Sequence, residues 1–192
     1  MFMKLSSQID TLNEKVAGVV SWALLIAVII CACNALIRYS FNYSSNGWLE
    51  VQWYLYAAVF MLASAYTLRR DEHVRIDVVV GRFSKRTQAW IDLLGFLIFL
   101  IPVCLLILWH GTPFALLSIR SAEMSSNAGG LIVWPAKILI PLGFFLLVLQ
   151  GLSEIIKRIA FLSGRSDGRE FAKHVTTPQD EIAAIKAANH LD

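Results

Sequence analysis

The stretch Val16–Ile37, VAGVVSWALLIAVIICACNALI, contains no charged residue and decides the fold class. A helix needs about 20 mostly apolar residues to cross the hydrocarbon core of a bilayer, and this stretch reaches that length. It is longer than the apolar core of a signal peptide, and Arg38 and Tyr39 follow it in place of a small-residue cleavage site. We therefore predict a retained transmembrane helix over residues 16–37.

Three further stretches have the same apolar character and predict helices over residues 51–68, 90–109 and 138–156. The third span carries Asp92 near its start and Pro102 as an expected kink. The composition agrees, because 57% of the residues are hydrophobic and only 16% are charged, whereas about a quarter are charged in soluble domains. The sequence thus predicts an all-α integral membrane protein with four transmembrane helices.

The distribution of lysine and arginine predicts the orientation of these helices. All but three of the 17 basic residues lie in the N-terminal arm, in the loop between the second and third spans, or in the tail; the exceptions are Arg38, Arg120 and Lys137. Loops on the cytoplasmic side are enriched in lysine and arginine. With four spans, both termini are therefore expected in the cytoplasm.

The segments outside the spans complete the expected domain organisation. In residues 1–15 and at Val16, apolar side chains recur at spacings of three and four, which predicts an amphipathic helix; they are Phe2, Leu5, Ile9, Leu12 and Val16. This arm could lie on the cytoplasmic membrane surface or pack against a partner. A membrane domain over residues 16–162 and a flexible cytoplasmic tail over residues 163–192 would follow.

The polar residues of the chain do not predict an enzyme, a cofactor or a metal site. Ion and proton paths usually need ionisable groups near the bilayer midplane, but here the charged residues near the spans lie at span ends: Arg38, Glu50, Arg69, Asp92, Lys137 and Glu154. The four histidines are placed so that no two can meet as haem ligands inside the membrane. The three cysteines lie in apolar runs and are expected to be buried packing residues. The basic residues form no continuous face, so no nucleic-acid partner is expected.

The loop between the second and third spans carries charges of both signs in the sequence RRDEHVRID, residues 69–77. Its arginines could hold the second helix at an anionic lipid surface. The interleaved acidic residues would oppose that role and favour an ion-paired turn or a protein interface. We therefore interpret the following residues as a structural hinge or a partner-binding site: Arg69, Arg70, His73, Arg75 and Asp77.

The element His73-Val74-Arg75-Ile76-Asp77, followed by three valines, resembles one in the small membrane subunit of tripartite ATP-independent periplasmic (TRAP) transporters, the DctQ type. Other similarities follow in the same order along the chain: Trp48 and Glu50 at the start of the second span, Glu123 and Ser125 in the outer loop, and Trp134-Pro135 before the fourth span. The resemblance covers residues 15 to 160 and leaves out the tail.

The resemblance implies an accessory scaffold subunit in the bacterial inner membrane. It would work with a large multi-span membrane subunit and a periplasmic solute-binding protein, which together import an organic acid with sodium. Substrate and sodium ligands would then lie on those other chains. Four residues become candidates for an interface at the outer face: Trp48, Glu50, Glu123 and Trp134. A membrane anchor for an enzyme or redox complex is the alternative function.

Overall fold

The computed structural model describes residues 2–43, 45–70 and 83–164, which form long helices joined by turns and one ordered loop. The helices are α1 (Phe2–Phe41), α2 (Asn46–Arg70), α4 (Lys85–Gly95), the π-helical turn η1 (Phe96–Leu100), α5 (Ile101–Arg120) and α6 (Trp134–Leu162). α4, η1 and α5 form one uninterrupted helical rod, so the described chain has four rods long and apolar enough to cross a membrane. This confirms the predicted all-α membrane fold.

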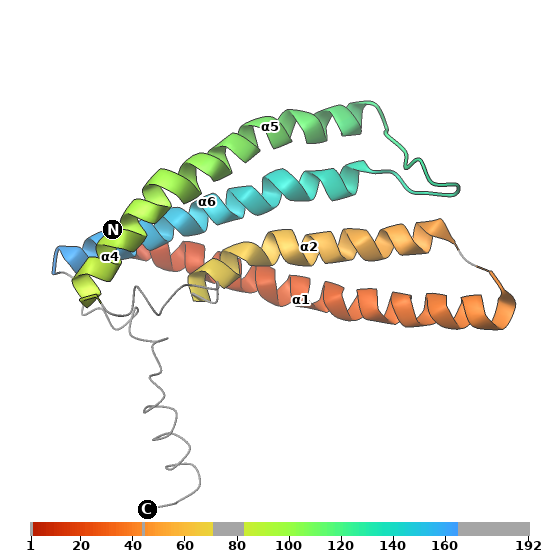
Figure 1. Cartoon of the computed structure of the whole chain (residues 1–192), viewed down its shortest axis with the longest axis horizontal. Helices are drawn as coiled ribbons and strands as arrows, with labels where there is room; N and C mark the ends of the chain where they lie inside the picture. Colours follow the sequence, from red (N-terminus) through yellow and green to blue (C-terminus); the bar gives the residue numbers. More distant parts are fainter. Residues whose placement is uncertain (1, 44, 71–82, 165–192) are drawn as a thin grey trace, which may run out of the picture.

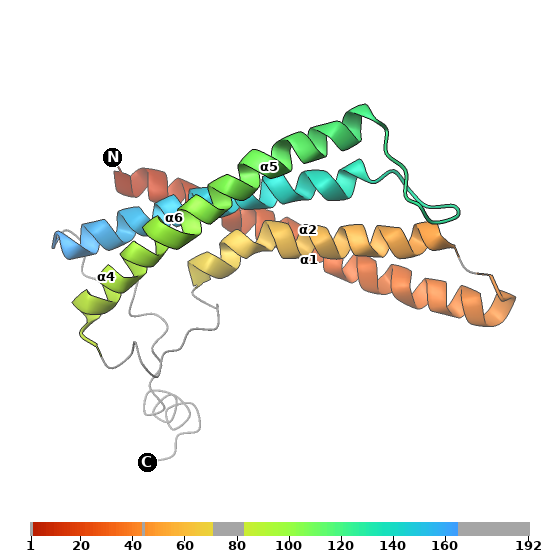
Figure 2. The same ribbon diagram turned by 45° about the horizontal axis from the view of Figure 1, so that its top comes forward.

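α6 is the central helix of the bundle, since it contacts α1, α2, α4 and α5. α5 and α6 run side by side, as do α1 and α2 (Figure 1). The N-terminal part of α1 crosses the C-terminal part of α6 (Figure 2). We name the end of the bundle that carries residues 121–133 the loop end, and the opposite end, where α1 begins and α6 finishes, the network end.

The surface of the bundle is apolar and its interior contains many small residues. Trp22, Phe60 and Trp109 are among the large apolar side chains that face outward, as expected for helices surrounded by lipid. Small residues between membrane helices let their backbones approach closely. A Cβ atom on Gly143 of α6 would lie 2.7 Å from the carbonyl oxygen of Met61 of α2, so only glycine fits at this crossing.

The outward orientation of apolar residues also corrects one expectation. Cys104 is buried as predicted, but Cys31 and Cys33 are exposed on the surface of α1. An apolar run in a membrane helix has no obligatory inward face, because lipid accepts a small apolar side chain as readily as the protein interior does.

The helices extend beyond the spans expected from hydropathy. α1 continues from the first span back to Phe2, and α5 continues past Trp109 to Arg120. Hydropathy detects the part of a helix that lies in hydrocarbon, whereas backbone hydrogen bonds extend a helix into the polar interface. The predicted N-terminal arm is therefore the first part of α1 and not a separate helix.

The arm packs with its polar side inward. Ser6 and Asn13 are fully buried, whereas Leu5 and Leu12 are 49% and 45% exposed. The buried side lies against α6, as hydrogen bonds from Ser6 to Ser153 and from Asn13 to Gln150 show. The arm thus docks on this chain's own α6 and directs its apolar side outward.

The third rod contains a π-helical turn next to the proline that was expected to kink it. Pro102 has no backbone N–H, so it cannot make the hydrogen bond of a regular α-helix. The preceding residues, Phe96–Leu100, form a π-helical turn in which the N–H of Ile101 donates to the carbonyl of Phe96. A π-turn of this kind absorbs a local mismatch in the hydrogen-bond ladder.

Two predicted segments lie outside the described residues. These are the central hinge residues, with His73, Arg75 and Asp77, and the tail after Gly164.

Candidate functional site

The loop between α5 and α6, residues 121–133, is an ordered hairpin at the loop end. Met124 and Ile132 form an antiparallel bridge, and the Ser125 N–H donates to the carbonyl of Leu131 at 2.9 Å. Ala122 and Gly129 adopt φ angles of 47° and 71°. Positive φ values of this kind let the chain reverse direction within a few residues. The loop therefore has a defined shape of its own.

Glu50, near the start of α2, holds this hairpin against the bundle. Its carboxylate is 3% exposed and accepts three hydrogen bonds from the loop. Oε2 accepts from the backbone N–H of Leu131 at 2.6 Å, and Oε1 accepts from the Asn127 amide at 2.9 Å and from the Ser125 hydroxyl. Hydrogen bonds to an ionised acceptor are about twice as strong as neutral ones. We name Glu50, Ser125, Asn127 and Leu131 the Glu50 clasp.

The clasp leaves no space for a side chain at Gly130. A Cβ atom there would lie 2.6 Å from the Cβ atom of Ser125 and 2.8 Å from Oε1 of Glu50. Two further hydrogen bonds join α2 to the loop: Asn46 donates to the carbonyl of Ala128 at 2.9 Å, and the Tyr54 hydroxyl donates to that of Ile132 at 3.1 Å. The start of α2 and the loop thus form one unit.

Glu123 has a different role from Glu50. Its carboxylate lies 2.5 Å from the Lys137 ammonium of α6, and this ammonium lies 4.2 Å from the centre of the Phe114 ring of α5. The hydrogen bond from Lys137 holds the pKa of the Glu123 carboxyl below its usual range. This pair joins the loop to both helices that flank it.

The four predicted outer-face residues therefore do not form one cluster. Glu50 is internal and organises the loop, whereas Glu123 is part of an ion pair at the surface. Trp48 and Trp134 are exposed at the starts of α2 and α6. The clasp and the ion pair fix the surface on which these two indoles lie.

A second polar site lies at the network end and joins four helical elements. We name it the charged network; its members are Ser6, Asp10, Asn13 and Glu14 of α1, Arg69 of α2, Asp92 of α4, and Gln150, Ser153, Glu154, Lys157 and Arg158 of α6.

The first part of the charged network joins α1 to α6 through Asp10. Its Oδ1 atom accepts from the Gln150 amide and the Ser153 hydroxyl, each at 2.9 Å. Its Oδ2 atom lies 2.6 Å from the Lys157 ammonium. Asn13 donates to Gln150 at 2.7 Å alongside. A carboxylate that leaves water is tolerated only when its oxygens are satisfied in this way.

The second part of the network joins α6 to α4 through Arg158, which is only 2% exposed. Its guanidinium lies 2.5 Å from Glu154 on α6 and 3.1 Å from Asp92 on α4. The same guanidinium lies 4.5 Å from the centre of the Phe96 ring, at the π-helical turn. Because arginine presents several donors in a fixed plane, it can bind two carboxylates and an aromatic face together.

The predicted hinge residues Arg69, a member of this network, and Arg70 lie at the end of α2. Arg69 donates to the backbone carbonyl of Asp10 and to the carboxylate of Glu14, both at 3.0 Å. Arg70 lies over the ring of Tyr66, 5.0 Å from its centre. Arg69 therefore joins α2 to α1 within this chain.

Sequence reasoning placed Asp92 and Glu154 at span ends but missed the network that they join. The signal was a polar stripe with helical spacing on each of two helices: Ser6, Asp10 and Asn13 on one, and Gln150, Ser153, Glu154 and Lys157 on the other. Each stripe alone is typical of a solvated helix face. The two stripes become buried only because the two helices cross and pack against each other. Within the described parts of the chain, no group of three histidine, cysteine, aspartate or glutamate residues could hold a metal ion.

Comparison with known families decides the identity of this bundle. The family model described as "Tripartite ATP-independent periplasmic transporters, DctQ component" matches residues 26–161, which is more than half of the 192 residues. The chain belongs to the DctQ family. A comparison with curated proteins gives no match. As a DctQ component, the chain is the small membrane subunit of a TRAP transporter, which is a transport component and not an enzyme.

The DctQ match covers the two polar sites to different extents. It includes the Glu50 clasp and the α6 residues of the charged network up to Arg158. It begins after Asp10 and Asn13, so the part of the network on the first turns of α1 lies outside the matched region. The DctQ family also implies a large membrane subunit and a periplasmic binding protein as general partners.

Proposed function

We propose that this DctQ subunit is a scaffold for the large membrane subunit of a transporter that imports an organic acid with sodium. One observation supports this proposal: the middle of every rod lacks charge. No Asp, Glu, Lys or Arg occurs in residues 16–37, 51–68, 93–119 or 138–153. A sodium or carboxylate path needs polar or ionisable groups near the bilayer midplane. The transport path would therefore lie on the large subunit.

The proposed partner surfaces lie at both ends of the bundle. At the loop end, the exposed residues Trp48, Glu123 and Trp134 would meet the large subunit or the solute-binding protein. At the network end, Arg70 would meet the large subunit, and we propose the same role for His73, Arg75 and Asp77, which lie outside the described residues. Glu50 and Arg69 would support these surfaces from inside, because both already bind other parts of this chain.

The test of this function is reconstitution into sealed vesicles with the large subunit and the solute-binding protein. We expect uptake of an organic acid driven by a sodium gradient only when all three proteins are present, and none from this chain alone. Arg75→Ala or Asp77→Ala should lower the yield of large subunit that co-purifies with this chain. Uptake by the single chain, or co-purification with a haem or iron–sulfur protein in place of a multi-span subunit, would refute the proposal.

We also propose that both termini and the network end face the cytoplasm, from the positions of the basic residues. In a variant without native cysteines, a cysteine at Ser126 in the exposed loop should react with an impermeant thiol reagent in intact cells. A cysteine at Lys85, at the start of α4, should react only after the cells are opened. Labelling at position 85 in sealed cells would reverse the proposed orientation.

A further inference from the structure

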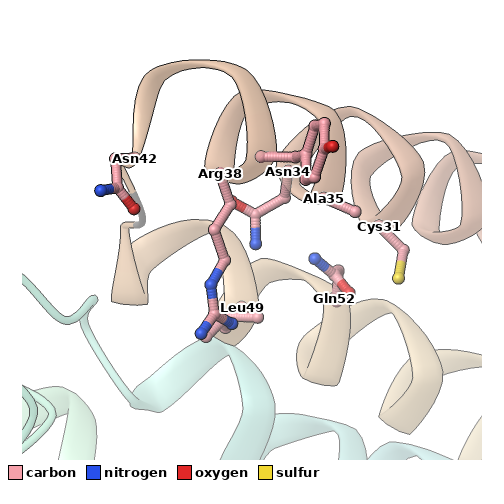
Figure 3. Close-up of a pocket in the computed structure, with 8 residues that line it drawn as sticks. Cys31, Asn34, Ala35, Arg38, Asn42, Leu49 and Gln52 are labelled. Carbon is pink, nitrogen blue, oxygen red and sulfur yellow. The ribbon is translucent and has the colours of Figure 1, made fainter.

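A polar pocket lies between the end of α1 and the start of α2 at the loop end. It is lined by Asn34, Arg38 and Tyr39 of α1 and by Leu49 and Gln52 of α2, among others. Figure 3 shows the side chains of Arg38, Asn34 and Gln52 directed into the space between the two helices. The pocket is separate from the Glu50 clasp, whose carboxylate faces the 121–133 loop.

The pocket contains hydrogen-bond donors that lack acceptors. The Gln52 side chain is 94% buried, since its exposed fraction is 6%, and its Nε2 atom has no hydrogen-bond partner among the described residues. A buried amide donor without an acceptor is unfavourable, because it has lost its hydrogen bonds to water without replacing them. The Arg38 guanidinium forms neither an ion pair nor a hydrogen bond with any residue in the described ranges. The pocket therefore suits a ligand that supplies both an anion and a neutral acceptor.

The depth of the donors restricts the ligand further. Arg38 lies in the last turn of α1, close to the polar interface. Asn34 is one turn deeper, about 5–6 Å along the helix axis, and Gln52 lies in the second turn of α2. Below them the side of α1 that continues from the pocket is apolar, with Leu24 and Val28 exposed. The ligand must carry an anion at its head, an acceptor below the head, and an apolar tail.

We propose that this pocket binds one glycerophospholipid. Its phosphate would accept hydrogen bonds from Arg38, whose fork of donors matches phosphate oxygens. An ester carbonyl oxygen, which lies below the phosphate in such a lipid, would accept from Nε2 of Gln52. The acyl chains would follow the exposed apolar surface of α1. Free phosphate has the anion but lacks the carbonyl and the chains, so the combined site selects the lipid.

The test is native mass spectrometry of the full-length protein in mild detergent, titrated with phosphatidylglycerol. We expect Arg38→Ala to weaken lipid binding at least about tenfold, because a hydrogen bond to a charged group contributes that much. Gln52→Met removes a neutral donor at similar size and should weaken it about threefold. Arg120→Ala is the matched control, since Arg120 is an exposed cation at the same end and lies outside the pocket. It should leave the affinity unchanged.

Three outcomes would overturn the lipid proposal. Equal losses in Arg38→Ala and Arg120→Ala would mean non-specific attraction to any cation at this end. Displacement of the lipid by inorganic phosphate at equal concentration would mean a free-anion site. Unchanged lipid affinity with loss of the co-purifying large subunit in Arg38→Ala would assign Arg38 to a partner's carboxylate. Arg38→Lys keeps the positive charge but loses the planar set of guanidinium donors. An intermediate lipid affinity with an unchanged circular dichroism spectrum would support the assignment of Arg38 to the lipid phosphate.

Discussion

Replacement of Arg158 by methionine is expected to lower the stability of the isolated subunit by about 3–5 kcal/mol, the cost of breaking a buried ion pair from one side. Arg158 is 2% exposed and lies between Glu154 and Asp92. Methionine fills much of the same volume but cannot donate a hydrogen bond. Glu154, which is 6% exposed, would keep Lys157 as its cation but lose its closest one. The link from α6 to α4 and to the Phe96 ring would be lost as well.

The measurement is reversible unfolding in mixed detergent micelles, followed by circular dichroism. Arg158→Met combined with Glu154→Gln removes one charge of each sign, so the double variant should be more stable than Arg158→Met alone. Arg70→Met is the matched control, because Arg70 is an exposed cation at the same end whose contact among the described residues is with the Tyr66 ring. A surface change of this kind should alter stability by less than about 0.5 kcal/mol. Equal effects of Arg158→Met and Arg70→Met would show that the buried pairs do not hold the helices together.

Replacement of Glu50 by alanine is expected to release the 121–133 loop from α2. The Leu131 N–H, the Asn127 amide and the Ser125 hydroxyl would together lose the carboxylate that accepts their hydrogen bonds. Each hydrogen bond to a charged group contributes about 1.5–3 kcal/mol. We therefore expect the amide hydrogen of Leu131 to exchange with solvent at least about tenfold faster, because even the weakest of these bonds contributes that much.

Hydrogen exchange of the loop, measured by mass spectrometry in detergent, tests this prediction. Glu50→Gln keeps the size of the side chain but not its charge, so it should give an intermediate rate. Glu123→Gln is the matched control, because Glu123 is in the same loop and its carboxylate pairs with Lys137 near the surface. An exposed ion pair contributes only about 0–1 kcal/mol. Unchanged exchange at Leu131 in Glu50→Ala would contradict the prediction and show that hydrogen bonds within the hairpin are enough to hold the loop.

These two predictions concern one functional idea, that the subunit presents rigid surfaces to moving partners. The charged network holds α1, α2, α4 and α6 together at one end, and the Glu50 clasp fixes the loop at the other. Most polar groups in both sites pair with one another within the chain, although the buried Oδ1 atom of Asn13 has no hydrogen-bond partner among the described residues. Such internal pairing is suited to a scaffold, since a transport site would keep its polar groups available for a substrate.

The sequence by itself determined the all-α membrane fold and the DctQ family. The fold followed because crossing a bilayer requires a continuous apolar length, a property that can be read from one segment such as residues 16–37. The family followed from short elements along the chain, including Trp48 and Glu50 and the motif at residues 73–77, and the match over residues 26–161 confirms it.

Only the tertiary structure decided which polar residues meet. Asp10 and Gln150 are 140 positions apart, and Asp92 and Arg158 are 66 apart, yet each pair is in contact. Such contacts depend on how each helix is rotated and where it crosses its neighbours, and these are set by close packing at positions such as Gly143. Hydropathy does not show how a helix is rotated about its own axis, because lipid accepts apolar side chains on every face of the helix. For this reason Asp92 and Glu154 could be placed at span ends from the sequence, whereas their partners became visible only in the folded bundle.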